Sequence, residues 1–280
     1  MGIARGANLF LLACGFSLIF GTLRVINLAH ATFYIIGAYI CYSCVGFLGS
    51  SNGFWLGLLV APIAVALLAA IFERGLLRYV YKRGDLYQLL LTWAMVFILG
   101  DLIKFVWGGA TKAIPPPAVL SGAVRLPFGN MATAQLFSIG IAVLVFIGFH
   151  FLLYRTRVGL LTRATAANPE ITEALGTDIT NLHTFIFALS CWLGGLGGAI
   201  GGLLAPVYVG KDVEYLLLAF IIAVVGGTGS ITGCLVASLI IGVVYSLGIL
   251  VLPAFAMVFL YAIMVLVLLV RPYGLFGKPI

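Results

Sequence analysis

The feature that most constrains this chain is a series of nine apolar runs separated by short polar gaps. Only 8% of the residues are charged, against roughly a quarter in a soluble domain, so the chain could not cover a surface that faces water. In hydrocarbon every backbone polar group must be satisfied, and a helix does this within one segment. We therefore predict an all-α polytopic membrane protein with eight to nine transmembrane segments, some of them broken or half-length. The runs are 7–20, 31–48, 54–72, 87–107, 134–154, 183–205, 215–225, 232–252 and 254–270.

The run 215–225 is too short to cross a bilayer alone, because a spanning helix needs about 20 residues. We interpret it as a half-helix or as a strongly packed short span. The stretch 226–233 that follows contains glycines and hydroxyls, which permit a break in a helix at membrane depth.

The basic residues indicate an orientation. They gather in the gaps 73–86 and 155–182 and in the C-terminal tail, whereas 49–53 has none and 108–133 has two. The excess of Lys and Arg on the cytoplasmic side places the C-terminus inside and the N-terminus outside, with 206–214 outside or dipping in from that face. The net charge of +7 is dispersed over these gaps, so we expect no nucleic-acid partner.

The sequence offers no pattern for catalysis, metal binding or ATP binding. Cys41 and Cys44 form a CxxC pair without a second pair to complete a metal site, and we expect small packing residues there. No phosphate-binding Gly-x-x-x-x-Gly-Lys-Ser/Thr loop is present. Asp101 and Lys104 are three residues apart, which favours a structural ion pair over an ion pathway. We expect no catalytic residue and no metal site.

Two polar segments interrupt the membrane sequence and resemble each other weakly. The first, 21–30, contains Arg24, Asn27 and His30, and it is either a broken helix that lines a cavity or a plain cytoplasmic turn with a snorkelling arginine. The second is 226–233. Paired interrupted segments in the two halves of a chain are typical of the central site of a transporter.

The stretch 155–182 is the longest amphiphilic part of the chain. Asn168 is suited to cap a helix that starts with Pro169, and Gly176 is suited to end it. We predict a short helix over 169–175 on the cytoplasmic surface. It is either an ordinary connection or a docking element for a soluble partner.

Four blocks of this sequence resemble the LivH-like permease subunits of ABC importers for branched-chain amino acids. They cover nearly the whole chain in the order of the family. The blocks are 15–30 (GFSLIFGTLRVINLAH), 163–176 (RATAANPEITEALG), 194–202 (GGLGGAIGG) with 226–233 (GGTGSITG), and 271–277 (RPYGLFG). The resemblance implies one permease transmembrane domain over 1–280, with a cytoplasmic coupling segment at 155–182.

The resemblance also implies partners and a location. The chain would bind no cofactor itself, because ATP would be bound and hydrolysed by separate cytoplasmic ATP-binding subunits. A second, homologous permease would complete a heterodimer in the bacterial cytoplasmic (inner) membrane, and an extracytoplasmic solute-binding protein would supply branched-chain amino acids or related amino acids and amides. The residues expected to line the translocation pathway are Asn27, His30, Thr228 and Ser230.

By the same resemblance, the segment 163–176 would dock as a coupling helix on the ATPase, with apolar groups as anchors and the acidic groups pairing with basic residues of the partner. The coupling residues are Arg163, Ala167, Asn168, Glu170, Glu173, Leu175 and Gly176. Two alternatives come from other classes: a stand-alone secondary transporter or channel for a small polar solute, and a structural scaffold. The first would leave the amphiphilic helix unexplained, and the second would leave the polar breaks unexplained.

Overall fold

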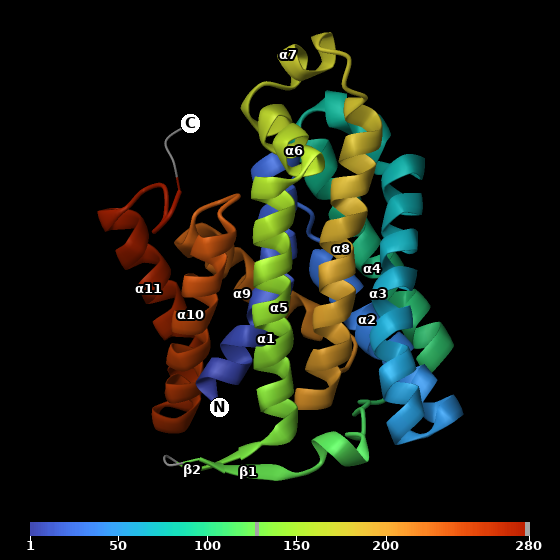
Figure 1. The fold of residues 1–280 in the computed structure, drawn as a ribbon, viewed down its shortest axis with the longest axis vertical. Coiled ribbons are helices and arrows are strands. Elements are labelled where there is room, and N and C mark those ends of the chain that lie inside the picture. Colours follow the sequence, from blue (N-terminus) through green and yellow to red (C-terminus); the bar gives the residue numbers. More distant parts are fainter. Residues whose placement is uncertain (127–128, 278–280) are drawn as a thin grey trace.

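The computed structural model describes residues 1–126 and 129–277 and is mainly helical (Figure 1). Within these residues eight segments are long and apolar enough to cross a membrane, which confirms the predicted all-α polytopic class. They are α1 (Gly2–Leu23), α2 (His30–Leu48), α3 (Ser50–Gly75), α4 (Asp85–Trp107), α5 (Thr133–Arg155), α8 (Ile179–Leu204), α10 (Ile231–Val251) and the stretch Pro253–Val270, which joins η3 (Pro253–Phe255) to α11 (Ala256–Val270).

The ninth apolar run forms α9 (Lys211–Gly226), a helix of 16 residues that spans about 24 Å at 1.5 Å per residue. It is therefore shorter than the roughly 30 Å of a bilayer core, which agrees with both interpretations, a half-helix and a strongly packed short span. One boundary was wrong: residues 211–214, assigned to the polar gap, form the first turn of α9. Gly210 turns the chain at a φ of 98°, and Asp212 and Glu214 are acidic groups at the positive end of the helix.

Shorter elements fill the gaps. The all-α class omitted one of them, an antiparallel hairpin in which Ala123 pairs with Ala132. This hairpin follows three prolines in the long polar gap, and the prolines prevent that gap from continuing a helix. The elements are η1 (Leu77–Arg83), η2 (Ala118–Leu120), β1 (Ala123–Leu126), β2 (Gly129–Ala132), α6 (Arg157–Ala167) and α7 (Pro169–Ala174).

Helix α8 lies at the centre of the bundle, because its glycines let three other helices approach its backbone. A Cβ atom on Gly195 would lie 3.0 Å from the Cα of Pro62 in α3, and one on Gly198 would collide with the carbonyl oxygen of Tyr34 in α2. Gly197 packs in the same way against Leu11 in α1. Small residues at helix contacts allow such close packing in membranes.

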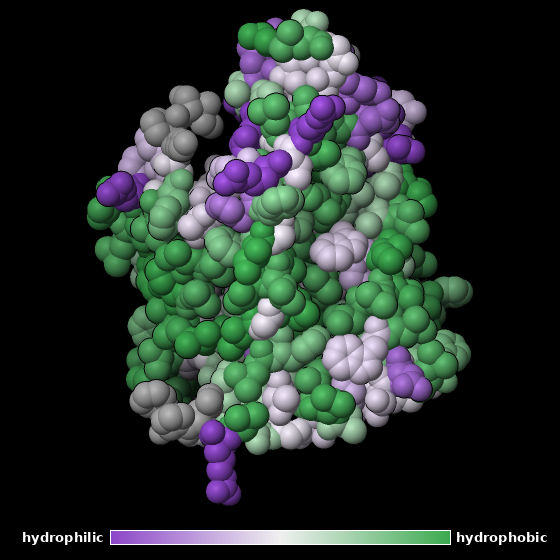
Figure 2. All heavy atoms as spheres, in the orientation of Figure 1, coloured by the Kyte–Doolittle hydropathy of each residue, from purple (hydrophilic) through white to green (hydrophobic). Residues whose placement is uncertain are grey.

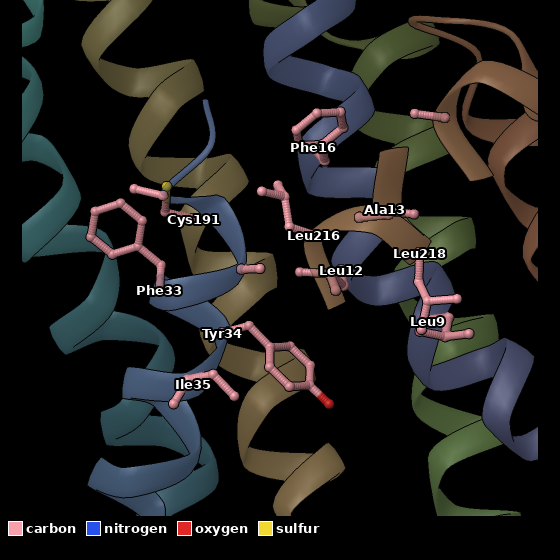
Figure 3. Packing of buried hydrophobic residues seen from close by; sticks show 14 of the residues in the cluster. Leu9, Leu12, Ala13, Phe16, Phe33, Tyr34, Ile35, Cys191, Leu216 and Leu218 are labelled. Atoms are coloured by element: carbon pink, nitrogen blue, oxygen red, sulfur yellow. The ribbon is translucent and has the colours of Figure 1, made fainter. Parts of the chain in front are cut away.

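Helix α1 packs antiparallel against α10 along most of its own length, whereas the last turns of α10 pack on α11. A Cβ atom on Gly2 would lie 2.8 Å from the Cα of Val243, and one on Gly6 would lie 2.6 Å from the carbonyl oxygen of Ser238. Apolar side chains of α1, α2, α8 and α9 pack together in the core between these four helices (Figure 3). In contrast, α5 and α11 are buried over only a small part of their length, which leaves their apolar faces to lipid or to another subunit.

The two ends of the bundle differ. Helices α6 and α7 lie at the same end as the last described residues, and we call this the α7 end (Figure 1). The strands β1 and β2 lie at the opposite end, which we call the hairpin end. Figure 2 shows an apolar band over the middle of the molecule, with hydrophilic residues gathered at the α7 end. This pattern is typical of a protein that crosses a bilayer.

Candidate functional site

The break between α1 and α2 carries polar groups back into the core. Arg24 is exposed and adopts a left-handed conformation with a φ of 55°, and from there the chain folds back toward the middle of the bundle. Asn27 and His30 are fully buried. The Asn27 side-chain oxygen accepts a hydrogen bond of 3.1 Å from the backbone N–H of Ala29. The segment is therefore a break within the bundle rather than a surface turn, but Asn27 and His30 are packed in the core and line neither cavity described below.

His30 begins α2 deep within the bundle. Its Nε2 lies 3.1 Å from the carbonyl oxygen of Leu12, which is in the middle of α1. A Cβ atom on Gly15 would lie 3.0 Å from this same nitrogen, so the imidazole is packed tightly against α1. His30 therefore joins the start of α2 to the middle of α1.

The glycine-rich turn after α9 packs on the end of α1. The backbone N–H of Gly229 donates a 3.0 Å hydrogen bond to the hydroxyl of Ser17, and a Cβ atom on Gly21 would lie 2.6 Å from the same nitrogen. The two polar segments are thus side by side at the α7 end of α1. Ser230 caps α10 by accepting a 3.0 Å hydrogen bond from the backbone N–H of Gly233, while Thr228 is exposed.

The four residues expected to line a pathway therefore lie in two environments. Asn27 and His30 are buried among α1, α2 and α8, whereas Thr228 and Ser230 belong to the turn at the α7 end. None of the four lines either of the two cavities described below. Their role in a pathway remains a prediction.

The predicted short helix of the amphiphilic segment is present as α7. The Asn168 side-chain oxygen accepts a 3.0 Å hydrogen bond from the backbone N–H of Ile171, Pro169 occupies the first turn, and Gly176 follows with a φ of 88°. The segment 163–176 is not one helix, however, because α6 ends before Asn168. A proline disfavours helical geometry in the residue that precedes it, and Asn168 is extended.

The residues of α7 are presented outward. Leu175 is 82% exposed and Ile171 59% exposed, and Glu170 and Glu173 are also exposed. Such apolar side chains at the tip of a polar segment are costly in water and favour a partner surface. Ala167 is exposed beside them.

The predicted coupling residue Arg163 contacts α5, and its part in coupling stays a prediction. Its guanidinium donates a hydrogen bond to the carbonyl oxygen of Leu153 and lies 5.0 Å from the ring centroid of Tyr154. These contacts hold α6 against the last turn of α5. Arg163 thus fixes the position of the segment, although its side chain remains exposed.

A cavity of about 330 Å³ separates the end of α1 from this segment. Thr22 and Arg24 line one side, and Thr165, Asn168 and His183 line the other. The polar break after α1 therefore faces the junction of α6 and α7.

A buried ion pair between α3 and η1, with a hydroxyl of α8 between its partners, was not predicted from the sequence. The Glu73 carboxylate in α3 is fully buried and accepts a 2.6 Å hydrogen bond from the hydroxyl of Thr184 in α8. The Arg78 guanidinium lies 3.6 Å from it and donates a 2.9 Å hydrogen bond to the same hydroxyl. The ion pair and this hydroxyl thus join α3 to α8 near the start of α8.

A second cavity, of about 190 Å³, lies toward the hairpin end between α1, α5, α8, α9 and α10. Three charged residues line it, namely Arg5, Lys211 and Glu214. Arg5 had no assigned role, and the other two residues were placed in a loop. This cavity could not have been found from the sequence, because its lining comes from five helices spread along the chain.

Comparison with known sequences decides the family. The sequence profile described as "Branched-chain amino acid transport system / permease component" matches residues 1–268. This chain belongs to that permease family.

Relatives of this permease cover nearly its full length. It is 27% identical over 290 residues to the high-affinity branched-chain amino acid transport system permease protein BraD of Pseudomonas aeruginosa, with 99% of this chain and 94% of that protein covered. It is 25% identical over 296 residues to the corresponding permease LivH of Escherichia coli, with the same coverage. It is also 27% identical over 247 residues to the guanosine ABC transporter permease protein NupQ of Bacillus subtilis, which covers 82% of this chain and 76% of that protein. No solved structure matches it.

Within the part of the permease that the structure describes, no group of three or more His, Cys, Asp and Glu side chains is arranged to hold a metal ion. Three features described above could serve transport. They are the exposed helix α7, the two polar breaks that touch at the α7 end of the bundle, and the charged cavity toward the hairpin end.

Proposed function

We propose that this permease is a transmembrane subunit of an ATP-driven ABC importer and forms part of the pathway for branched-chain amino acids or related amino acids and amides. The ATP is bound and hydrolysed by separate subunits, and a second, related permease completes a heterodimer. A solute-binding protein delivers the solute from outside. The C-terminus and the α7 end face the cytoplasm of a bacterial inner membrane.

The observation that carries this proposal is the exposed tip formed by α7. It presents Ile171 and Leu175 beside Glu170 and Glu173, so an apolar groove with basic residues on its rim would match it. Asn168, Pro169 and Gly176 fix the shape of the tip, and Arg163 fixes its position on the bundle. Movement of the bound ATPase would pass through such a tip into the helices.

The choice of solute rests on the relatives. The BraD and LivH proteins are named for branched-chain amino acids, whereas NupQ is named for guanosine. The higher coverage of the former supports an amino-acid solute.

The first test is affinity purification of the tagged chain in mild detergent, with mass spectrometry of the proteins that accompany it. We expect ATP-binding subunits and a second permease. The purified complex, reconstituted in proteoliposomes with its binding protein, should then take up leucine in the presence of ATP, with guanosine as the comparison solute. A chain that purifies alone and transports without ATP would instead be a secondary transporter or channel.

The second test addresses docking. Deletion of 168–175 or the substitutions Glu173→Gln and Leu175→Ser should abolish the stimulation of ATP hydrolysis while insertion into the membrane stays intact. Val119→Ser is a matched control, because Val119 is also an exposed apolar residue but lies in η2 at the hairpin end. Full coupling in the deletion variant would refute docking through α7.

A further inference from the structure

The cavity toward the hairpin end brings three charges to a place between membrane helices. Arg5 comes from the first turn of α1, and Lys211 and Glu214 come from the first turn of α9. Arg5 is exposed, and Lys211 and Glu214 are half-buried, so these charged groups are accessible from the hairpin end of the bundle. The question is whether these three groups neutralise one another.

They do not. In the described part of the chain, the ion pairs within 4.0 Å are Arg78 with Glu73 and Lys104 with Asp101, so neither Arg5 nor Lys211 has a carboxylate within that distance. The Arg5 guanidinium instead lies 4.4 Å from the centroid of the Tyr245 ring. Two cations and one carboxylate leave the cavity with an excess positive charge.

Aromatic side chains hold the charged groups apart. The Tyr245 hydroxyl donates a 2.7 Å hydrogen bond to Oε1 of Glu214. The Lys211 ammonium donates a 2.6 Å hydrogen bond to the carbonyl oxygen of Pro206 and lies 5.5 Å from the centroid of the Tyr215 ring. An ammonium has three donors and a guanidinium has five, so both cations keep donors for a ligand.

The polar side chain at the floor of the cavity, Asn8, already has hydrogen-bond partners within the protein. Asn8 donates a 2.9 Å hydrogen bond to the carbonyl oxygen of Gly197 and accepts one of 2.8 Å from the hydroxyl of Tyr34. Figure 3 shows Tyr34 extending from α2, with its hydroxyl directed away from that helix. Asn8 therefore fixes the shape of the cavity, whereas Arg5, Lys211 and Glu214 are the groups that can bind a ligand there.

The remaining wall is apolar. Ala4 and Leu9 of α1, Leu204 of α8 and Leu218 of α9 line it, and Figure 3 shows Leu9 and Leu218 next to each other. The volume of about 190 Å³ is below the roughly 300–1,000 Å³ of sites for drug-sized ligands. The cavity therefore suits a small solute that carries both charges and an aliphatic part.

We propose that this cavity binds the zwitterion of an aliphatic α-amino acid as it passes from the binding protein into the membrane. The carboxylate binds between Arg5 and Lys211, the ammonium binds at Glu214, and the side chain lies against the leucines. This assignment rests on the proposed import function and adds a solute site to it.

The test measures protection of a cavity residue from alkylation in the reconstituted complex. Ser246 lines the cavity, and the variant S246C in a C44S background, which removes the partly accessible Cys44, gives one accessible thiol in this chain, whose labelling is measured on the isolated band of this subunit. We expect leucine to slow the reaction with iodoacetamide. Isoamylamine, which lacks the carboxylate, and 4-methylpentanoate, which lacks the ammonium, should each protect at roughly tenfold higher concentration, because each loses one charged contact.

Three further variants connect the protection to the charges. R5Q and K211Q should weaken protection by leucine roughly tenfold, and E214Q should remove the preference for leucine over 4-methylpentanoate. R125Q is the matched control, because Arg125 is an exposed cation of the hairpin; it should leave protection unchanged. R5K, which keeps the charge, should restore part of the protection lost in R5Q.

Leucine uptake by the same proteoliposomes separates the two hypotheses. Uptake without protection, or equal protection by all three compounds, would overturn the zwitterion site and leave the import function standing. A complex that hydrolyses ATP but imports no amino acid would overturn the proposed solute and the site together.

Discussion

Gly21 and Gly229 lie so close that a Cβ atom on Gly21 would be 2.6 Å from the backbone nitrogen of Gly229. The break after α1 and the turn before α10 thus meet backbone to backbone at the α7 end. Gly229 also requires a positive φ, of 79°, which glycine adopts readily. This junction connects the two halves of the chain next to the cavity under α7.

Gly21→Ala should separate this junction and destabilise the protein by about 1–3 kcal/mol, the range for an added methyl group in a packed core. Thermal unfolding in detergent measures the loss. Gly46→Ala is the control, because a Cβ atom on Gly46 in α2 would meet nothing within 4 Å. Equal midpoints for the two variants would show that the junction has room to adjust.

Asn168→Ala should remove the cap of α7, at a cost of about 1 kcal/mol to this short helix. Because α7 is exposed, we expect the thermal midpoint of the whole protein to change little, while stimulation of ATP hydrolysis in the complex falls. Asn168→Asp keeps an acceptor oxygen and should preserve stimulation. If the Ala and Asp variants stimulate equally, the cap has no part in coupling.

Glu73→Ala should destabilise the protein by about 3–5 kcal/mol, the range for a buried ion pair that loses one partner. It leaves the Thr184 hydroxyl and the half-buried Arg78 without their carboxylate, and breaking a buried pair is costly. Asp101→Ala is the contrast. Asp101 forms a 3.0 Å ion pair with Lys104, as predicted from their spacing. Because this pair is exposed, its loss should cost at most about 1 kcal/mol. Chemical denaturation in the same detergent compares the two, and a larger loss for Asp101→Ala would contradict this interpretation.

Gly198→Ala should prevent α8 from packing on α2, because the added carbon would collide with the carbonyl oxygen of Tyr34. We expect a severe loss of monodisperse protein in size-exclusion chromatography. Gly148→Ala in α5 meets nothing within 4 Å and should behave as the wild type. A normal yield of the Gly198 variant would mean that the α2–α8 contact is less close than described.

The sequence predicted best what local chemistry determines. The apolar runs gave the spanning helices, and the order Asn168–Pro169 with Gly176 downstream predicted the start and end of α7, because a cap and a proline act within one turn. The family also followed from short motifs with fixed spacing. The boundary of α9 was missed because its first turn is charged, and charged residues at the start of a helix look like a loop when only apolar runs are counted.

The parts that escaped prediction depend on contacts between distant segments. Glu73 has a partner 111 residues away, and nothing near it in the sequence distinguishes it from the charges of a cytoplasmic gap. Arg5 had no assigned role because it is an isolated charge near the start of the first apolar run. The structure shows that Arg5 lines the same cavity as Glu214 and Lys211 of α9, a contact between distant segments that the sequence does not indicate.

The glycines of α8 limit how this permease can change shape. Where α8 contacts Tyr34 of α2 and Pro62 of α3, its glycines lie against backbone atoms of those helices. Backbone atoms, unlike side chains, cannot change rotamer to let one helix slide past another. Interlocked surfaces of this kind move as rigid bodies rather than deform. During a transport cycle α1, α2, α3 and α8 should therefore travel as one block, and the gates must open at its margins, where side chains and lipid can yield.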